Sequence, residues 1–354
     1  MDIQVTKIAA SRINEVDFKN LVFGRMFSDH MFVADYYDGE WRDARIEPFG
    51  DFSLHPATSA IHYGQSIFEG LKAEKNEKGN PIVFRPLKNW KRFNTSAERM
   101  AIPTLTEEYF MTALTTLLKL DHAWIPTEPL SALYIRPFMF ATEKFAGIRV
   151  ADNYRFCIFT CPVGAYYSKP VNVFVSDKYT RAAPGGVGFA KAAGNYGAAM
   201  MPSSQIQKQG YDQILWLDGI EHKYVQEIGT MNILFVVDGK ILTPSLEQGT
   251  ILDGVTRDSV LTLARQAGYT IEERPILIDE IIEAHKSGRL TDMFGCGTAA
   301  TLSPIGNFHY KGVDYPLPAA ETRPISNYLK NTLSAIKSGK MVDENNWKYE
   351  IVLQ

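Results

Sequence analysis

Apolar residues recur along the chain at two spacings, one typical of strands and the other typical of helices. Helical spacing over residues 110–118 follows Thr106, whose hydroxyl can cap a helix. Asp238-Gly239 stands between two apolar runs and predicts a tight type I′ hairpin. The pattern also predicts strands at 31–36, 82–84, 133–138, 155–160, 171–176 and 213–217, and helices at 196–209, 259–267 and 278–285. Strands and helices are mixed without a strict βαβ rhythm, which predicts an α+β fold.

The composition changes near the middle of the chain, where Gly164, Tyr166 and Ser168 stand between Pro162 and Pro170. Prolines and glycines between apolar runs are typical of connecting segments. A chain of 354 residues is expected to form about two domains, at roughly 150 residues each. We therefore predict an N-terminal domain over residues 1–165, an interdomain loop over 166–175 and a C-terminal domain over 176–354.

The overall composition argues against several classes of protein. The chain is 45% hydrophobic and 22% charged with a formal net charge of −3, so no positive field favours nucleic acid or an anionic membrane. No apolar run approaches the ~18 residues of a membrane span, and residues 1–18 lack the apolar core of a signal peptide. The three cysteines do not form a disulfide framework, and the seven histidines show no metal-ligand spacing. We expect a cytoplasmic enzyme without a metal, nucleic-acid or membrane partner.

Lys191 lies in the most informative segment, residues 185–197, where most of its neighbours are glycine or alanine. A lysine that forms an imine with a bulky planar aldehyde needs small neighbours, because the backbone must come close to the ring. Burial also favours the neutral amine, which is the nucleophile. A solvated lysine in a flexible glycine loop is an equally open interpretation, whereas a phosphate loop is disfavoured because G-x-G-x-x-G and G-K-[ST] are both missing. Asn195 is a suitable N-cap for the helix predicted after it.

Glu227 opens the second candidate segment, residues 227–232. A buried carboxylate beside a pyridine nitrogen keeps that nitrogen protonated, so that the ring can act as an electron sink. A surface glutamate at a strand end is the commoner alternative. Two glycine turns could hold a phosphate: residues 254–257, which lie just ahead of a predicted helix, and residues 295–299. Taken singly, each fits a simple glycine turn better.

Tyr134 and Arg136 lie on one face of a predicted strand, because strand side chains alternate. Such a pair could bind a carboxylate, with the arginine donating two parallel hydrogen bonds. An arginine that caps a sheet edge is the alternative. Arg92 is a similar case, and considered alone it indicates a solvated helix face.

Taken together and in order, these segments resemble the branched-chain-amino-acid aminotransferases, which are class IV (fold type IV) pyridoxal-phosphate enzymes. The resemblance covers most of the chain. It rests on Phe68-Glu69-Gly70-Leu71-Lys72, Phe84-Arg85-Pro86, Tyr134-Ile135-Arg136-Pro137, Cys161-Pro162-Val163-Gly164 and the segments 23–31, 185–197, 227–232 and 295–299. It implies a two-domain fold, with a smaller N-terminal α/β domain and a larger C-terminal domain that binds pyridoxal phosphate around a β-barrel-like core.

The resemblance also implies a reaction, the reversible transfer of an amino group from L-leucine, L-isoleucine or L-valine to 2-oxoglutarate. The products are the branched 2-keto acid and L-glutamate, in the final step of branched-chain amino acid biosynthesis or the first step of breakdown. Lys191 would carry pyridoxal 5′-phosphate as a Schiff base and shuttle the substrate proton. The family resemblance further implies a homodimer with its active sites near the interface.

The remaining site residues are likewise implied by the resemblance. Those expected to bind the cofactor are Tyr196 at the ring hydroxyl, Glu227 at the ring nitrogen, Thr230, and Arg92, Val255, Thr256 and Thr298 at the phosphate. Those expected on the substrate side are Tyr63, Tyr134 and Arg136 from across a dimer interface, Phe27, Phe68 and Tyr166 around the side chain, and Thr298 with Ala299 at the α-carboxylate. Ala300 and Ser303 replace the redox-sensitive Cys-x-x-Cys of vertebrate members, so no thiol switch is expected there.

Three alternatives stay open. The chain could be a D-amino-acid aminotransferase or an aminodeoxychorismate lyase of the same fold, although the run 23–31 favours the branched-chain type. It could be a non-catalytic scaffold, although Lys191, Tyr196 and Glu227 together argue against that. It could also be a lysine-dependent enzyme without the cofactor, such as an aldolase.

Overall fold

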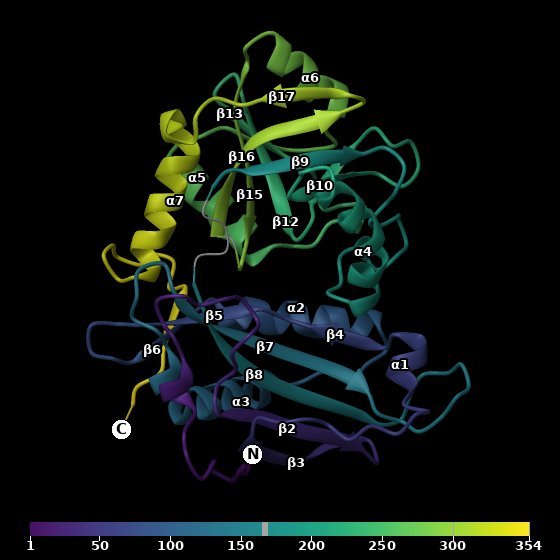
Figure 1. The fold of residues 1–354 in the computed structure, drawn as a ribbon, viewed down its shortest axis with the longest axis vertical. Helices are drawn as coiled ribbons and strands as arrows, with labels where there is room; N and C mark the ends of the chain where they lie inside the picture. Colours follow the sequence, from purple (N-terminus) through teal and green to yellow (C-terminus); the bar gives the residue numbers. More distant parts are fainter. Residues whose placement is uncertain (165–168, 300, 354) are drawn as a thin grey trace. The chain divides into compact units, whose positions relative to one another are not determined.

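The computed structural model describes residues 1–164, 169–299 and 301–353. Their contacts divide them into two compact units. The first unit holds residues 1–164, 190–194 and 337–353, and the second holds residues 169–189, 195–299 and 301–336. Both units mix helices with strands (Figure 1), in agreement with the predicted α+β fold.

A nine-stranded sheet forms the first unit. Its strands follow the order β1-β3-β2-β8-β7-β5-β6-β18, and β4 pairs with β7. Only β1 and β3 are parallel, and the other neighbours are antiparallel. The strands are β1 (Gln4–Val5), β2 (His30–Tyr37), β3 (Glu40–Pro48), β4 (Ser66–Phe68), β5 (Leu71–Lys75), β6 (Pro81–Phe84), β7 (Ala132–Ala141), β8 (Tyr154–Val163) and β18 (Lys348–Glu350).

Helices α2 (Pro86–Arg99) and α3 (Glu107–Leu120) cover one face of this sheet. Helix α3 begins where the sequence predicts, because the Thr106 side chain accepts a hydrogen bond from Tyr109 N at 3.1 Å. Phe93 of α2, Phe110 of α3 and Phe156 of β8 meet in one buried core. Because strand side chains alternate, the other face carries a second cluster, formed by Met31, Val33 and Cys157 with Phe49, Phe52, Phe138 and Phe159. The shorter helical elements are α1 (Ser59–Tyr63), η1 (Ile13–Glu15) and η2 (His122–Trp124).

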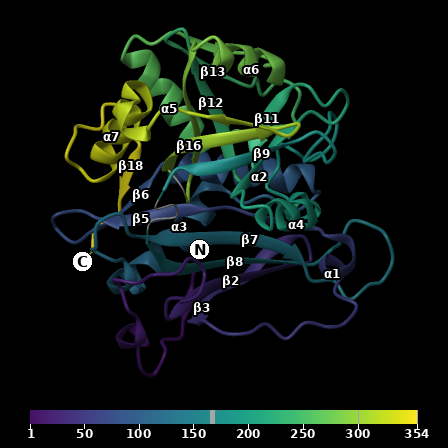
Figure 2. The same ribbon diagram turned by 45° about the horizontal axis from the view of Figure 1, so that its top comes forward.

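A closed barrel of six strands forms the centre of the second unit. The strands follow the order β11-β10-β9-β16-β15-β12, and a pairing between β11 and β12 closes the barrel. Strands β9, β12 and β16 of the barrel are labelled in both Figure 1 and Figure 2. Leu215, Ile233 and Phe308 are among the apolar residues of its core, and the expected β-barrel-like core is thus confirmed. The strands are β9 (Val171–Ser176), β10 (Gln213–Leu217), β11 (Val225–Ile228), β12 (Met231–Val237), β13 (Lys240–Thr243), β14 (Ile271–Glu273), β15 (Leu290–Gly297), β16 (Thr301–Tyr310) and β17 (Val313–Pro316).

Four α-helices accompany the barrel, and α5 and α6 both contact β15. They are α4 (Ala193–Gln207), α5 (Val255–Gln266), α6 (Ile278–Lys286) and α7 (Pro324–Lys337), with the short η3 (Ala320–Thr322) before α7. None of the helices described has the length and apolar character that crossing a membrane requires.

Two predicted helix starts are wrong. Helix α4 begins at Ala193, so Asn195 lies in its first turn and is not the N-cap; the Asn195 side chain instead donates to Val187 O at 2.9 Å. Helix α5 begins at Val255 and not at residue 259, because Asp258 N donates to the carbonyl of the N-cap Gly254 at 2.9 Å and closes the first turn. The hairpin prediction is confirmed, since Asp238 (φ 51°) and Gly239 (φ 74°) both adopt the left-handed backbone of a type I′ turn.

Candidate active site

The backbone of Lys191 is fixed within the first unit. Its N–H donates to Ser96 Oγ of α2 at 2.9 Å, and its carbonyl accepts from Phe68 N of β4 at 3.1 Å. The next residue, Ala192, forms an isolated β-bridge with Ile67. Lys191 is half-buried. The interpretation as a solvated lysine in a flexible loop is therefore wrong, because the lysine has a defined backbone position on strand β4 and helix α2.

The small residues before Lys191 have a structural cause that the sequence does not disclose. A Cβ at Gly188 would lie 2.5 Å from the carbonyl oxygen of Thr250, so only glycine fits there. Gly185 has φ of 77°, a backbone conformation that side chains disfavour. Close packing within the second unit thus explains some of the glycines that were expected, from the sequence, to make room for the ring of a planar aldehyde.

Phe68 is the ring on which the substrate-side residues and Lys191 converge. The Lys191 ammonium lies 4.7 Å from the centre of the Phe68 ring, and the Arg136 guanidinium carbon lies at the same distance. Arg136 Nη2 donates to Tyr134 Oη at 3.0 Å. Arg136 Nε is buried without a hydrogen-bond partner among the described residues. Strand β7 thus carries an arginine that lies over the same Phe68 ring as the predicted catalytic lysine, and a tyrosine hydroxyl that accepts a hydrogen bond from this arginine.

Two further residues of the predicted substrate side belong to the first unit. Phe27 packs in the same cluster as Tyr134 and stacks on Phe49 at 4.7 Å between ring centres. Tyr63 ends the short helix α1, is 40% exposed and donates from its hydroxyl to Ala146 O at 2.5 Å. Tyr166, also predicted for the side-chain pocket, lies outside the described residues, as does Ala300.

Arg92 forms a buried ion pair with Glu69, a residue for which the sequence predicted no role. Its Nε lies 2.7 Å from Glu69 Oε1, and the exposed fractions of the two side chains are 9% and 0%. The alternative of a solvated arginine on a helix face is therefore wrong. One signal could have found Glu69: it is the only charged residue between Gly64 and Leu71.

Glu227 is buried in the second unit and fixed by two donors. Arg181 Nη2 lies 2.9 Å from Glu227 Oε1, and Leu252 N donates to Oε2 at 2.7 Å. Arg181 in turn donates to Gly188 O at 2.8 Å. The surface-glutamate alternative is wrong, because only 6% of this side chain is exposed.

The two predicted phosphate turns are both present in the second unit. Gly254 is the N-cap of the twelve-residue helix α5, and a Cβ there would lie 2.0 Å from Asn232 Oδ1. Val255 and Thr256, in the first turn of α5, are buried. A helix N-terminus of this kind suits an anion, because its first N–H groups have no partner within the helix. The remaining predicted residues of this unit are the half-buried Tyr196, Thr298 and Ala299 and the exposed Thr230.

The predicted site residues therefore form one set in each unit. The first unit holds Phe27, Tyr63, Phe68, Arg92, Tyr134, Arg136 and Lys191; the second holds Tyr196, Glu227, Thr230, Val255, Thr256, Thr298 and Ala299. These residues suit pyridoxal phosphate, since they supply an amine, a buried carboxylate held by an arginine, and a helix N-terminus for the phosphate. The described residues include no group of three or more His, Cys, Asp or Glu that could hold a metal ion.

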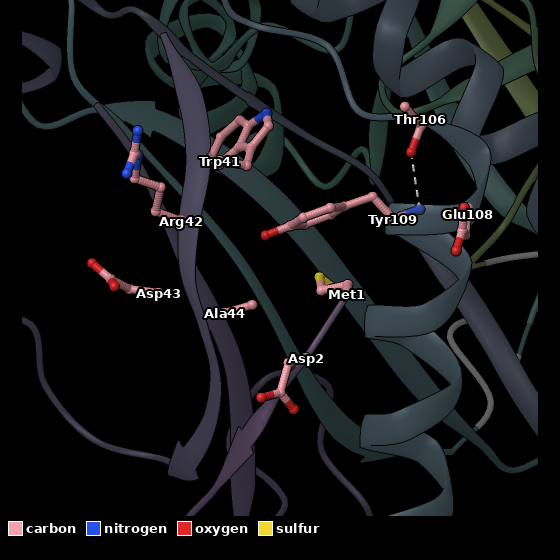
Figure 3. Close-up of a pocket in the computed structure, with 9 residues that line it drawn as sticks. All are labelled: Met1, Asp2, Trp41, Arg42, Asp43, Ala44, Thr106, Glu108 and Tyr109. Atoms are coloured by element: carbon pink, nitrogen blue, oxygen red, sulfur yellow. Dashed lines mark hydrogen bonds between the residues drawn. The ribbon is translucent and has the colours of Figure 1, made fainter. Parts of the chain in front are cut away.

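A cavity of about 420 Å³ lies elsewhere in the first unit (Figure 3). Its lining mixes aromatic rings, Trp41 and Tyr109, with the acidic side chains of Asp2, Asp43 and Glu108. Tyr109 Oη is buried without a hydrogen-bond partner among the described residues, and burial raises the pKa of this tyrosine to about 12. None of the predicted site residues lines this cavity, so it is separate from the candidate active site.

Comparisons with known proteins agree with this geometry. The family described as amino-transferase class IV matches residues 66–308. A probable branched-chain-amino-acid aminotransferase of Staphylococcus epidermidis is 44% identical over 95% of this chain and 94% of its own length. Branched-chain-amino-acid transaminase 1 of Bacillus subtilis is 45% identical over 95% of each chain.

Solved structures give the same result at the level of the fold. The branched-chain aminotransferase of Thermoproteus uzoniensis with norvaline superposes with a TM-score of 0.76 at 25% identity, over 91% of this chain and 100% of that chain. The PLP-form of the enzyme from Thermobaculum terrenum superposes with a TM-score of 0.73 at 23% identity, over 91% and 98%. This chain belongs to the branched-chain-amino-acid aminotransferases of the class IV aminotransferase family.

Proposed function

We propose that this chain transfers the amino group of L-leucine, L-isoleucine or L-valine to 2-oxoglutarate, and that Lys191 holds pyridoxal 5′-phosphate covalently. The products are the branched 2-keto acid and L-glutamate. The observation that carries the proposal is the position of Lys191, whose backbone bonds to Ser96 and Phe68 and whose amine lies over the Phe68 ring beside Arg136 and Tyr134. Family membership supports the same reaction.

When bound, pyridoxal 5′-phosphate supplies an electrophilic carbon for an amine and an electron sink for the bond that breaks at the substrate α-carbon. Lys191 Nζ then has two tasks, to hold the cofactor between turnovers and to move the proton at the substrate α-carbon. Both tasks need a lysine whose backbone stays fixed while its four-carbon side chain moves. The backbone hydrogen bonds that Lys191 N donates to Ser96 Oγ and that Lys191 O accepts from Phe68 N provide that arrangement.

Glu227 is proposed to face the ring nitrogen and to keep it protonated. Its carboxylate is oriented by Arg181 and by Leu252 N, so it does not have to reorganise when the ring binds. Tyr196 is proposed to donate to the ring hydroxyl. Arg92, Thr230, Thr298 and the N–H groups of Val255 and Thr256 are proposed to hold the phosphate.

Arg136 and Tyr134 are proposed to bind the side-chain carboxylate of glutamate. The buried Arg136 Nε, which has no hydrogen-bond partner among the described residues, is a donor that such a carboxylate would satisfy. Phe27, Phe68 and Tyr166 are proposed to line the pocket for the branched side chain, and Thr298 with Ala299 to receive the α-carboxylate. Aromatic walls suit leucine, whereas the arginine and the tyrosine hydroxyl suit glutamate, so one pocket can serve both substrates.

We also propose a homodimer in the cytoplasm, with no nucleic-acid or membrane partner, and a domain connection within residues 166–175. Tyr63 and the neighbouring Ile61 and Phe145 are exposed by 40%, 61% and 41%, and contact with a second copy would bury such apolar groups. Light scattering of the purified protein tests the dimer, and a monomeric mass at micromolar concentration would contradict it.

A spectrum and a donor panel test the proposed reaction. The purified protein should absorb visible light after incubation with pyridoxal 5′-phosphate, and borohydride followed by peptide mapping should label Lys191. Keto-acid formation should then be measured with L-leucine, L-isoleucine, L-valine and D-alanine as donors. A colourless protein would support the scaffold alternative, and activity on D-alanine alone would contradict the branched-chain assignment.

A further inference from the structure

Glu69 is a fully buried carboxylate between strands β4 and β5. Burial of an unpaired carboxylate costs several kcal/mol, so a charge at this position needs a partner. Arg92 is that partner, with Nε 2.7 Å from Oε1 and Nη2 2.9 Å from Oε2. Two parallel bonds of this kind fix the plane of the guanidinium as well as its position.

The Glu69 carboxylate is itself held in place. Asn89 Nδ2 donates to Oε2 at 2.8 Å, and Gly70 N donates to the same oxygen at 3.0 Å. Asn89 is 2% exposed and also donates to Gly70 O at 3.3 Å. The orientation of Arg92 is therefore set by a group that cannot rotate.

Residues on one face of helix α2 form hydrogen bonds with both Glu69 and Lys191. Asn89, Arg92 and Ser96 lie along one stripe of the helix, at spacings of three and four residues. Ser96 Oγ donates to Arg92 O at 3.0 Å and accepts from Lys191 N at 2.9 Å. Burial alone would raise the pKa of the Glu69 carboxyl, but the charges of Arg92 and Lys191 outweigh it and hold that pKa below its usual value.

We propose that Glu69 is a positioning residue, which orients the Arg92 guanidinium toward the cofactor phosphate and balances its charge beside Lys191. The inference rests on the proposed function, in which Arg92 binds the phosphate. Without the carboxylate, Arg92 can adopt other rotamers, and each directs its donors differently. A glutamine keeps the shape of Glu69 but has only one acceptor atom, so it cannot hold the guanidinium through two bonds.

Two ligands that differ only in the phosphate test this role. The full-length apoenzyme carrying Glu69→Gln is titrated with pyridoxal 5′-phosphate and, separately, with pyridoxal. The affinity for pyridoxal 5′-phosphate should fall about tenfold, whereas the affinity for pyridoxal should change less than about twofold. Asp292→Asn is the matched control, because Asp292 is a buried carboxylate paired with Arg323 in the second unit. It should lower the melting temperature without altering the ratio of the two affinities.

A double variant separates positioning from a merely structural role. Arg92→Met leaves Glu69 buried without its counter-charge and should lower the melting temperature. Adding Glu69→Gln should restore most of that temperature and cause no further loss of pyridoxal 5′-phosphate affinity, because both residues act through one contact. Asn89→Ala, which removes the 2.8 Å bond to Glu69 together with the weaker 3.3 Å bond to Gly70 O, gives a second measure if Glu69→Gln does not fold. It should cause the same selective loss, at about threefold.

Equal losses for the two ligands, or independent effects in the double variant, would overturn the inference. Failure of the proposed function is distinguishable from this outcome. In that case the wild-type protein itself would bind no cofactor at Lys191, as borohydride labelling reports. A wild-type protein that binds the cofactor, together with a Glu69→Gln variant whose two affinities fall equally, would refute only the role of Glu69.

Discussion

Gly70 leaves the space that the hydroxyl group of Tyr134 occupies. A Cβ at Gly70 would lie 2.2 Å from Tyr134 Oη and 2.9 Å from Tyr134 Cζ. The same hydroxyl accepts the 3.0 Å hydrogen bond from Arg136. Gly70→Ala must therefore displace the tyrosine ring at the point where it contacts Arg136.

The size of the effect follows from how little the Tyr134 ring can move. Its hydroxyl must withdraw by at least about 1.2 Å to restore ordinary van der Waals contact with the new Cβ. The ring is only 7% exposed, and its centre lies 4.9 Å from that of Phe23, edge to face. Overpacking of this kind costs about 1–3 kcal/mol in the free energy of unfolding. A weakened bond to Arg136 should raise the KM for L-glutamate about tenfold, which corresponds to about 1.4 kcal/mol, and should affect L-leucine less.

Urea denaturation and steady-state kinetics with L-glutamate and L-leucine measure the two effects of Gly70→Ala. Gly50→Ala is the matched control in the same unit, because a Cβ there would meet only Pro48 O at 3.9 Å. Adding Tyr134→Phe to Gly70→Ala should recover part of the stability but not the KM for L-glutamate. Wild-type stability of Gly70→Ala, together with an unchanged ratio of the two KM values, would refute the reasoning.

Three further predictions concern Lys191, Glu227 and the cysteines. Lys191→Ala should abolish transamination at an unchanged melting temperature, because alanine keeps the backbone bonds to Ser96 and Phe68; near-normal turnover would contradict the assignment. Glu227→Gln should retain bound cofactor, by its visible absorbance, while kcat falls about a hundredfold, and an unchanged kcat would remove the ring-nitrogen role. Burial raises the pKa of Cys161 to about 11 and of Cys296 to about 12, and raises that of Cys157 as well, so at pH 8 the reactive thiolate is scarce in all three. A thiol reagent should label them only after unfolding, and rapid labelling of the native protein would contradict this burial.

Local chemistry made part of this fold predictable. The cap at Thr106 and the left-handed pair Asp238-Gly239 depend only on neighbouring residues, and the structure contains both. The long-range strand pairing within the barrel could not be predicted in the same way. Strand β16 pairs in parallel with β9, so that Ile305 lies opposite Val171. No local pattern specifies a partner more than a hundred residues away.

The residues of the candidate site likewise fall into those that the sequence could predict and those that only three-dimensional contacts reveal. Composition alone left the roles of Lys191 and Glu227 open, and the family resemblance of the whole set of segments implied them. Glu69 and Arg181 were missed, because each gains its meaning from a partner distant in the sequence, Arg92 or Glu227. The glycines before Lys191 were expected to make room for the ring of a planar aldehyde. Gly188 is instead required because a Cβ there would clash with the Thr250 carbonyl. A buried ion pair depends on the three-dimensional contact of its members, and only the structure shows that contact.

Three separate stretches of sequence make up the first unit, and this affects the order in which the two units can fold during synthesis. Strand β18 (Lys348–Glu350) pairs with β6, so β6 has no partner on that side until residues 348–350 have been synthesised. At about 5–20 residues per second, a ribosome needs roughly 9 to 35 seconds to pass from residue 164 to residue 337. The second unit, although later in the sequence, is therefore the first to have all its residues available. A truncation before β18 would damage the unit that begins the chain, by leaving β6 as an unpaired edge open to association with other strands.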